Sequence, residues 1–339
     1  MTFQFNLNGC GRSAITAPPL GIPSLTVRSP SLTVRSPAVT PGPADLELPR
    51  RMIKSLSLLT ALWAISASAL ADNASIVGTW TLAAADKILP DGSRVPDYVT
   101  HAVTDMARPT TDKLVDDDRK PVALITFAGI KPGDKVADVM PGGGYFTRIF
   151  SNVVGAKGHV YAVIPESLAA KAPPEKFNAI HALLADPTYN GNISLEIRPY
   201  DRLDVGAPLD VVWTSQNYHD VYGAVSVFSV SGSTGPEQAA KLDAAAFEAL
   251  KPGGVFMVVD HAAAPGSGGR DASTLHRIDP ATVIAQAKAA GFELEGTSDV
   301  LRNPQDAHSK EVFDPEIKGH TDKFVLKFRK PRGGSKAAP

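Results

Sequence analysis

The sequence is nearly free of cysteine: among 339 residues the one cysteine is Cys10. It lies in an N-terminal segment that we expect the mature protein to lack. A mature chain without cysteine has no thiol nucleophile, no disulfide framework and no cysteine metal site. These three kinds of chemistry are therefore excluded.

The chain also lacks a basic run. Its formal net charge is −1, but the first 71 residues carry six Lys and Arg against two Asp and Glu, which leaves −5 for the remainder. Neutralisation of a nucleic-acid backbone needs clustered Lys and Arg. We therefore expect no nucleic-acid partner and favour a small-molecule substrate. The oligomeric state is not encoded in any pattern that we find.

The apolar stretch Leu56–Leu70 is shorter than the ~20 residues that a membrane-spanning helix needs. It follows a basic start and ends in Ala69-Leu70-Ala71, the small-x-small pattern that signal peptidase reads. We interpret residues 52–71 as a signal peptide whose removal releases an exported, periplasmic protein with no membrane anchor.

Residues 1–51 precede this signal and are rich in Pro, Ser and Thr, with the tandem repeat SLTVRSPSLTVRSP. They show no core-forming pattern, so we expect a disordered leader, or a start codon assigned too early. The mature chain then divides into an N-terminal helical cap region at 72–134, one domain at 135–330 and a disordered tail at 331–339.

Short β-rich runs alternate with helical runs from residue 135 onward. Five apolar runs rich in Val and Ile predict buried strands at 135–140, 159–164, 193–199, 209–215 and 254–262. Helical spacing follows at 145–155, 174–186, 236–250 and 279–291. Such alternation predicts an α/β fold, a doubly wound parallel sheet with helices on both faces.

The end of the chain departs from this alternation. Residues 292–303 and 322–330 read as two strands without an obvious helix between them, so we expect an antiparallel last strand in a seven-stranded, mostly parallel sheet. Ahead of the sheet, Asp97–Ala107 and Asp116–Gly129 have helical patterns. They could cap the open edge of the sheet or the mouth of a site.

The first strand-to-helix turn is the most informative stretch. In KVADVMPGGGYF, the apolar strand runs into Gly142, Gly143 and Gly144, which have no Cβ to keep a ligand from the backbone. Amide groups at the start of the next helix could face a carboxylate or phosphate. Ligands of open parallel sheets bind at such turns.

Glu166 follows the second predicted strand, where an acid can accept hydrogen bonds from both hydroxyls of a ribose. Glycine turn and acid together indicate a nucleoside-containing cofactor; the alternative is a tight turn and a surface glutamate. A dinucleotide fingerprint G-x-G-x-x-G begun at Gly142 would end on Thr147, and no P-loop lysine follows the turn. A dinucleotide oxidoreductase is therefore disfavoured and a P-loop is excluded.

With these motifs the sequence resembles the class I S-adenosylmethionine-dependent methyltransferases, in particular a group of predicted exported methyltransferases. The resemblance covers roughly residues 116–330. It depends on the motifs VADVMPGGGYFTR, LDVVWTSQNYHD, LKPGGVFMVVDH and GSGGRDASTLHRID, and on the acid after the second strand. It implies a Rossmann-like fold, S-adenosylmethionine as the cofactor and methyl transfer to an unidentified small acceptor.

The resemblance also implies roles for particular residues. Asp138 and the turn residues Pro141, Gly142, Gly143, Gly144 and Tyr145 would surround the methionine part of the cofactor. Glu166 would bind the ribose and Asp201 would lie near the adenine. Ser215 and Gln216 would lie near the transferred methyl group. Each residue also has an ordinary interpretation as a turn or surface residue.

The family pattern D-x-G-x-G-x-G has Met140 in place of its first glycine here. We expect Met140 to pack under the turn while the three glycines keep the backbone accessible. The alternative is a site that binds the cofactor weakly or has lost it. The retained Asp138, Gly142, Gly144 and Glu166 favour the first interpretation.

His219 and Asp220 follow the fourth strand, on the ligand side of the sheet. We predict His219 as the base for an acceptor that must lose a proton, with Asp220 or Tyr218 orienting the histidine or the acceptor. A structural histidine that caps a loop is the alternative. His219, His261, His276 and Asp260 could bind a metal, but no pair has i, i+4 spacing, so no metal ligand is assigned. The competing hypothesis for the whole chain is a non-catalytic nucleoside- or metal-binding protein on the same fold.

Overall fold

Seven strands form one sheet in the computed structural model, which describes residues 87–189, 191–223 and 235–333. The leader, the predicted signal peptide, residues 72–86 of the cap region and residues 334–339 of the tail lie outside the described residues. The strands are β1 (Lys135–Val139), β2 (His159–Pro165), β3 (Ile193–Arg198), β4 (Leu209–Ser215), β5 (Leu250–His261), β6 (Glu293–Ser298) and β7 (Lys323–Arg329).

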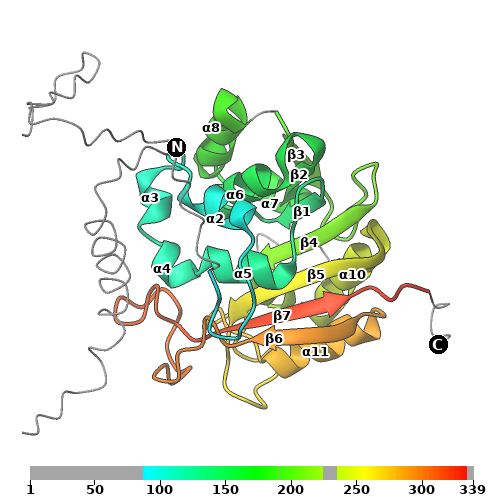
Figure 1. The fold of residues 1–339 in the computed structure, drawn as a ribbon. Helices are drawn as coiled ribbons and strands as arrows, with labels where there is room; N and C mark the ends of the chain where they lie inside the picture. The colour runs from blue at the N-terminus through cyan, green and yellow to red at the C-terminus, as the bar shows by residue number, and fades with distance from the viewer. Residues whose placement is uncertain (1–86, 190, 224–234, 334–339) are drawn as a thin grey trace, which may run out of the picture. The chain divides into compact units, whose positions relative to one another are not determined.

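The strand order is β3-β2-β1-β4-β5-β7-β6. The first five strands pair in parallel, and β7 lies antiparallel between β5 and β6 (Figure 1). The predicted α/β, doubly wound, seven-stranded sheet with an antiparallel last strand is confirmed. Strand order reverses between β1 and β4, which is where open sheets of this kind bind ligands.

Helices connect the strands and precede the sheet. They are α2 (Asp97–Thr104), α3 (Thr110–Lys113), α4 (Asp116–Arg119), α5 (Pro121–Ala128), α6 (Tyr145–Val154), α7 (Glu166–Lys171), α8 (Asn178–Ala185), α9 (Tyr218–Tyr222), α10 (Gly235–Ala249) and α11 (Pro280–Ala289). Short 3-10 turns lie at Gly155–Lys157, Pro174–Phe177 and Pro187–Tyr189.

The predicted helix at Asp116–Gly129 is divided into α4 and α5 in the structure. Lys120 between them has a left-handed backbone with φ of 46°, and Pro121 starts α5. The residue before a proline is disfavoured in the right-handed helical conformation, so the helix ends there. A pattern of apolar spacing alone does not reveal this break.

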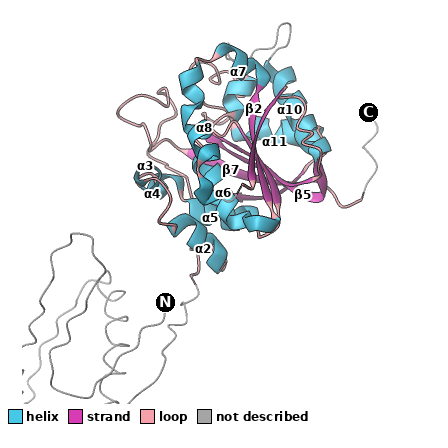
Figure 2. Cartoon of the chain, turned by 90° about the horizontal axis from the view of Figure 1, so that it is seen from above, coloured by secondary structure: helices cyan, strands magenta, loops and turns pink. Residues whose placement is uncertain are grey.

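Alternate strand residues bury two separate faces of the sheet. Val136, Val211, Trp213 and Met257 pack with apolar residues of α2, α5 and α6. The neighbouring strand residues, such as Val212, pack with α10 and α11 on the other side. Figure 2 shows these helices on the two faces of the sheet. Burial of a large apolar side chain contributes about 1.5–3 kcal/mol, so these two layers supply the main favourable term of folding.

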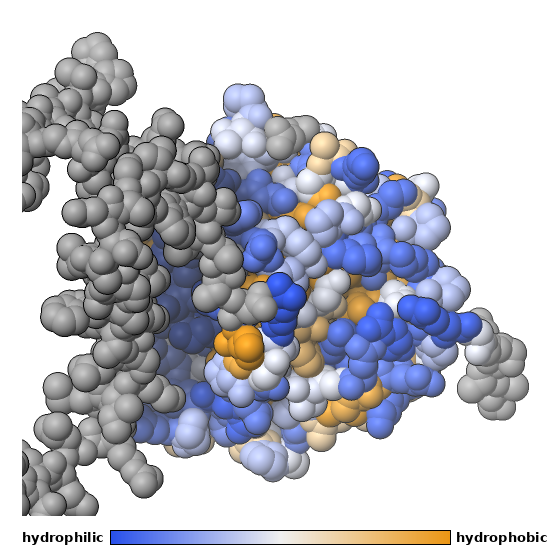
Figure 3. Space-filling view, in the orientation of Figure 1, coloured by the Kyte–Doolittle hydropathy of each residue, from blue (hydrophilic) through white to orange (hydrophobic). Residues whose placement is uncertain are grey.

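The face of the described chain that is seen in Figure 3 is mainly polar. On the face in Figure 3, apolar residues form small, separate patches among hydrophilic ones. Within the described residues, none of the helices combines the length and the hydropathy needed to span a bilayer.

Candidate functional site

The glycine turn joins the end of β1 to the start of α6 at the carboxyl edge of the sheet. Met140, Gly142 and Gly144 have left-handed φ angles of 57°, 57° and 82°. These are the three positions at which the D-x-G-x-G-x-G pattern places glycine. Met140 therefore adopts the backbone conformation of the glycine that it replaces, at a cost of roughly 1–2 kcal/mol for an L residue.

The individual glycines of the turn have different surroundings. A Cβ at Gly144 would lie 2.6 Å from Leu183 Cδ2 and 3.2 Å from Ile180 Cδ1 of α8, whereas a Cβ at Gly142 would meet nothing within 4 Å. Gly144 is thus required by helix packing as well as by its φ angle. Gly142 instead leaves open space beside the backbone.

A cavity of about 440 Å³ opens on one side of this turn. It is lined by the turn, by the residues that follow β4 and by the helical cap ahead of the sheet. Its lining residues include Asp112, Arg119, Asp138, Met140, Pro141, Gly142, Gly143, Tyr145, Ser215, Gln216 and Asn217. The cap region therefore forms one wall of the cavity, and the volume is within the roughly 300–1,000 Å³ range of small-molecule sites.

Asp138 and Arg119 bring opposite charges to this cavity. Asp138 is 3% exposed, and its carboxylate accepts a hydrogen bond of 2.7 Å from the Thr147 hydroxyl. Burial raises the pKa of Asp138 to about 7, although the Thr147 hydrogen bond and the charge of Arg119 act to lower it. The Arg119 guanidinium lies 4.4 Å from the centroid of the Tyr145 ring, which holds it over the cap side of the cavity.

A second cavity of about 270 Å³ adjoins the first across the turn. Both cavities are lined by Met140, Pro141, Gly142 and Asn217. The second one has an apolar side formed by Ile164, Leu168 and Phe177 and a polar side formed by Asp220 and His276. The turn thus lies between two adjoining cavities with different linings.

Asn217, which follows β4, holds the glycine turn in position by side-chain hydrogen bonds. Its Nδ2 donates hydrogen bonds of 2.8 Å to the Ser215 carbonyl and 3.2 Å to the Met140 carbonyl. A side chain that bonds the end of one strand to the turn after its neighbour fixes the distance between them. The carbonyl of strained Met140 is therefore held by a partner distant in sequence.

Backbone strain is concentrated at the cavities. Among the described residues, Lys120, Met140, Gln216, His276 and His308 are the non-glycine residues with positive φ. Met140, Gln216 and His276 line one or both cavities. Such conformations cost of order 1–3 kcal/mol and cluster at functional sites. Their positions support a ligand-binding role for this edge of the sheet.

His219 lies behind the second cavity, on α9, and is 2% exposed. Its Nδ1 contacts Asp260 Oδ1 at 2.7 Å, and its Nε2 lies 3.3 Å from both Asp220 Oδ1 and His276 Nδ1. Burial acts to lower the pKa of His219, but the charge of Asp260 and the hydrogen bond with Asp220 outweigh it and raise the pKa to about 10. The protonated, positively charged imidazole is therefore stabilised by two carboxylates, one at each ring nitrogen.

Asp260 fixes this histidine from the end of β5. The carboxylate is 0% exposed and also accepts hydrogen bonds from the backbone N–H groups of His219, at 2.8 Å, and His261, at 2.7 Å. Three donors on one buried carboxylate define its orientation, and hence that of the His219 ring.

His261 belongs to a different set of contacts. Its Nδ1 lies 2.7 Å from Thr321 Oγ1, and burial together with the positive charge of His219 holds the pKa of His261 well below its usual range. The ring of His261 lies near that of His219, with centroids 5.8 Å apart, but the cluster of possible ligand atoms found among the described residues consists of His219, Asp220 and His276. Asp220 takes the place of His261, because the β5 backbone directs the His261 ring toward the segment before β7.

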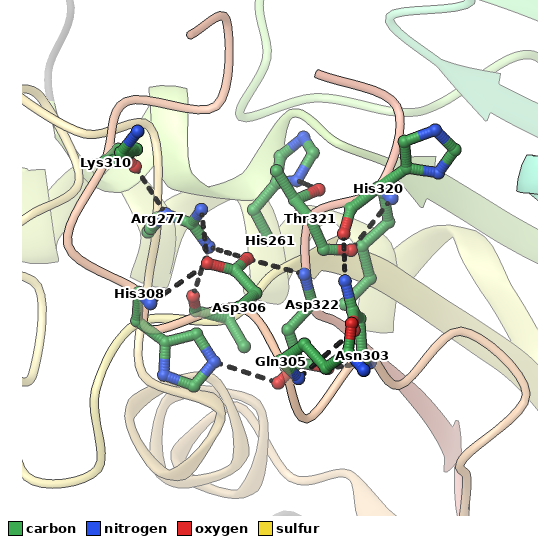
Figure 4. Close-up of polar contacts among 12 residues, drawn as sticks. His261, Arg277, Asn303, Gln305, Asp306, His308, Lys310, His320, Thr321 and Asp322 are labelled. Carbon is green, nitrogen blue, oxygen red and sulfur yellow. Dashed lines mark hydrogen bonds and ion pairs between the residues drawn. The ribbon is translucent and has the colours of Figure 1, made fainter. Parts of the chain in front are cut away.

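Arg277, the residue after His276 in the chain, is held by buried polar contacts, which Figure 4 shows. Arg277 is 0% exposed; its Nη1 lies 2.9 Å from Asp306 Oδ2 and 3.0 Å from the Ala262 carbonyl, and its Nε donates to the Lys310 carbonyl at 2.9 Å. The guanidinium thus ties the loop that carries His276 to the segment between β6 and β7.

Asp322 completes this network. Its carboxylate accepts hydrogen bonds of 2.9 Å from Arg302 Nε and 2.7 Å from the Asn303 N–H, and lies 2.9 Å from His308 Nε2 (Figure 4). The long connection before β7 is therefore held by buried polar contacts in place of a helix. This explains why no helical pattern appears there in the sequence.

The structure brings most of the predicted site residues together. Asp138, Pro141, Gly142, Gly143, Tyr145, Ser215 and Gln216 all line the larger cavity. Asp220 lines the smaller cavity with His276, and His219 lies directly behind them. Met140 is 7% exposed and joins the apolar core, in agreement with packing beneath the turn.

Gly144, Glu166 and Asp201 occupy other places. Gly144 packs against α8, and Glu166 is exposed at the start of α7, between the lining residues Ile164 and Leu168. Asp201 is exposed and lines a separate hollow with residues at the amino ends of β4 and β5, because the chain turns back directly after β3. Asp201 is therefore not brought to the glycine turn.

Four further residues of the site were not selected from the sequence. Asn217 lies next to the predicted Gln216, and Thr147 follows the turn on the buried side of α6. Asp112 and Arg119 come from the cap region. The sequence indicates these two only indirectly, through the expectation that the cap region could cover the open edge of the sheet or the mouth of a site.

The fold and the two cavities define an α/β protein with two adjoining cavities at the carboxyl edge of its sheet. Solved structures with a similar fold include a SAM-dependent methyltransferase from Aquifex aeolicus, at 16% identity over 67% of this chain and 96% of that one, with a TM-score of 0.43. The [4+2]-cyclase SpnF has 15% identity over 66% of this chain and 81% of its own, with a TM-score of 0.46.

A third similar structure is fibrillarin from Aeropyrum pernix, in complex with natively bound S-adenosyl-L-methionine. It has 14% identity over 63% of this chain and 76% of its own, with a TM-score of 0.36. No family model and no curated protein matches the chain. The similarities to solved structures concern the fold.

Proposed function

We propose that this chain is an S-adenosylmethionine-dependent methyltransferase that binds its cofactor around the glycine turn. One observation carries the proposal. All three glycine positions of the D-x-G-x-G-x-G pattern, Met140 included, have left-handed backbone, and the turn that they build lines two adjoining cavities. The substitution of Met for Gly has kept the shape of the turn.

The larger cavity suits the amino-acid end of the cofactor. Gly142 leaves open space that a Cβ would occupy. The Arg119 guanidinium is placed to attract a carboxylate, and the Asp138 carboxylate can accept from an ammonium group. A cation near Asp138 also favours its ionised form, against the burial that raises its pKa to about 7.

The smaller cavity suits the adenosyl part. Ile164, Leu168 and Phe177 offer apolar contacts to a planar base. Glu166 lies in the chain between the lining residues Ile164 and Leu168, so it would bind the ribose at the rim of the smaller cavity. Asp220 and His276 on the polar side would face the methyl acceptor.

When bound, the cofactor supplies an electrophilic methyl group on a positively charged sulfur. Displacement at that carbon has a neutral leaving group, so the protein contributes mainly by aligning the acceptor. Ser215 and Gln216 follow β4 and line the larger cavity, where they can contact the reacting groups. The acceptor remains a small molecule of unidentified class.

Calorimetric titration of the full chain with S-adenosylhomocysteine tests the proposal. We expect binding that Gly142→Ala weakens at least about tenfold, a loss of about 1.4 kcal/mol, because the new methyl group projects into the space beside the turn. Gly129→Ala is the matched control: its φ is 75°, and a Cβ there also meets nothing within 4 Å, but it ends α5 and lines neither cavity. Glu166→Ala tests ribose recognition separately.

Absence of binding to the unsubstituted chain would contradict the proposal, as would equal effects of Gly142→Ala and Gly129→Ala. Enhancement of NADH fluorescence on mixing with the chain, without S-adenosylhomocysteine binding, would favour an oxidoreductase. These measurements need no knowledge of the acceptor.

We also propose that the chain is exported. The support is the sequence pattern of residues 52–71, which lie outside the described residues. Mass spectrometry of the protein from a secreting host should find Asp72 as the first residue.

A further inference from the structure

The contacts among His219, Asp220 and His276 form a nearly equilateral triangle of donor atoms. His219 Nε2 lies 3.3 Å from Asp220 Oδ1 and 3.3 Å from His276 Nδ1, and His276 Nδ1 lies 3.1 Å from Asp220 Oδ1. Each of the three side chains offers one ligand atom, and the three atoms lie within 4.8 Å of one another. Two imidazoles and a carboxylate are a ligand set typical of divalent transition metals.

The size of this triangle matches a tetrahedral metal site. Zinc-to-ligand bonds of roughly 2.0–2.1 Å require ligand atoms roughly 3.3–3.4 Å apart along each edge of a tetrahedron. The observed edges of 3.1–3.3 Å differ from this by no more than a few tenths of an ångström. An ion could therefore enter with little movement of the side chains.

The chemistry of His219 requires a cation at this point. Its Nδ1–H donates to Asp260 Oδ1 at 2.7 Å, which leaves a lone pair on Nε2 in the neutral ring. That lone pair faces the Asp220 carboxylate, so two electron-rich atoms oppose each other in a buried place. Either a proton or a metal ion must lie between them. A buried carboxylate on the second nitrogen of a metal-binding histidine is the usual supporting contact of such sites.

His276 is held in place for the same purpose. It has a left-handed φ of 56°, and its neighbour Arg277 is fixed by the buried contacts to Asp306. Its ring packs edge-on against the ring of His219, with centroids 5.3 Å apart. The other ring nitrogen of His276, Nε2, lies 3.9 Å from Glu311 Oε1. Strain that neighbouring contacts maintain is expected where a side chain must be aimed.

We propose that His219 Nε2, Asp220 Oδ1 and His276 Nδ1 bind one divalent transition-metal ion, with an open coordination position toward the smaller cavity. Asp220 and His276 line that cavity, so the open position faces it, and an oxygen atom of a bound substrate or a water molecule completes the coordination. His261 is not assigned as a ligand, because the cluster of ligand atoms found among the described residues consists of His219, Asp220 and His276.

This assignment changes the predicted role of His219. A nitrogen bound to a metal has no lone pair with which to accept a proton, so His219 is a metal ligand and not a base. An ion at this place lowers the pKa of a hydroxyl or water that binds it. The metal site does not depend on the proposed cofactor: the ion and S-adenosylhomocysteine bind by separate groups and can be measured separately.

The experiment uses the full chain, stripped of metal with a chelator and titrated with Zn²⁺ against a chromogenic competitor. We expect one Zn²⁺ per chain and at least a 100-fold loss of affinity in His276→Gln and in Asp220→Asn. Both side chains are partly exposed, at 20% and 17%, so these variants should fold, which circular dichroism checks. His320→Gln, at a histidine 72% exposed, is the matched control and should bind as the unsubstituted chain does.

Asp260→Asn should weaken Zn²⁺ binding by about 10–100-fold, the usual cost of losing a supporting contact. Replacement of Zn²⁺ by Co²⁺ should give the intense visible bands of a tetrahedral ion, and His276→Gln should lose them. Failure of the unsubstituted chain to bind Zn²⁺, or undiminished binding by His276→Gln, would overturn the proposal and leave the proton as the shared cation. If the unsubstituted chain binds Zn²⁺ but does not bind S-adenosylhomocysteine, the result would contradict the proposed function and leave the metal site standing.

Discussion

Gly142 and Gly144 lie two residues apart in one turn, and the structure gives them different sensitivities to the same substitution. Both have left-handed backbone, with φ of 57° and 82°. Alanine at either position incurs the left-handed cost of about 1–2 kcal/mol. Only at Gly144 does the added Cβ also meet side chains, Leu183 Cδ2 at 2.6 Å and Ile180 Cδ1 at 3.2 Å.

Overpacking of this kind typically costs a further ~1–3 kcal/mol. We therefore expect Gly144→Ala to lower the free energy of unfolding by about 2–5 kcal/mol and Gly142→Ala by about 1–2 kcal/mol. The presence of Met140 supports the smaller loss expected for Gly142→Ala, because this turn already contains a residue with a side chain at the same φ of 57°. Urea denaturation of the full chain, followed by tryptophan fluorescence and circular dichroism, measures both.

The two variants should separate stability from binding. Gly144→Ala acts through α8 and should lose mainly stability, whereas Gly142→Ala acts at the cavities and should lose mainly S-adenosylhomocysteine affinity. Equal losses of stability in the two variants would refute the packing argument. A loss below about 1 kcal/mol in Gly144→Ala would refute the left-handed cost as well.

Two further predictions concern buried charges. Arg277→Leu should lower the free energy of unfolding by about 3–5 kcal/mol, because it leaves the Asp306 carboxylate buried without its cation. Arg198→Leu, whose ion pair with Glu196 is partly exposed on both sides, at 36% and 23%, should lose at most about 1 kcal/mol in the same urea titration. Burial raises the pKa of Asp138 to about 7 in the folded chain, against 3.8 for an ordinary aspartate, so the folded chain retains a proton that the unfolded chain releases. The free energy of unfolding should therefore fall as pH rises from about 4 to about 7. Asp138→Asn should flatten this dependence, and an unchanged slope would count against the assignment.

Much of the fold could be predicted from sequence because its signals are local. Runs of Val and Ile mark β1 to β5, and first-turn proline and terminal glycine mark α11 and its end. Alternation of the two kinds of run then determines a parallel sheet, since parallel strands need crossover connections. The glycine turn placed Gly142 at one edge of that sheet, and the resemblance to the methyltransferases implied the same edge for Asp138, Ser215 and Gln216; all four line the larger cavity.

Local signals fail where the tertiary structure chooses the partners. Nothing in the sequence around Asp201 shows that the chain turns back after β3, and Met140 does not reveal its left-handed φ. Both depend on contacts made elsewhere, such as that between Asn217 and the Met140 carbonyl.

The sequence by itself determined the strands, their alternation with helices and a glycine turn suited to a ligand. The tertiary structure alone decided which histidines meet. His219 and His276 are 57 residues apart, and their approach depends on β5, the buried Arg277 and the loop before β7. Local patterns report how one segment uses its own apolar residues, whereas a cluster of ligand atoms 3.1–3.3 Å apart results from the packing of distant segments against one another.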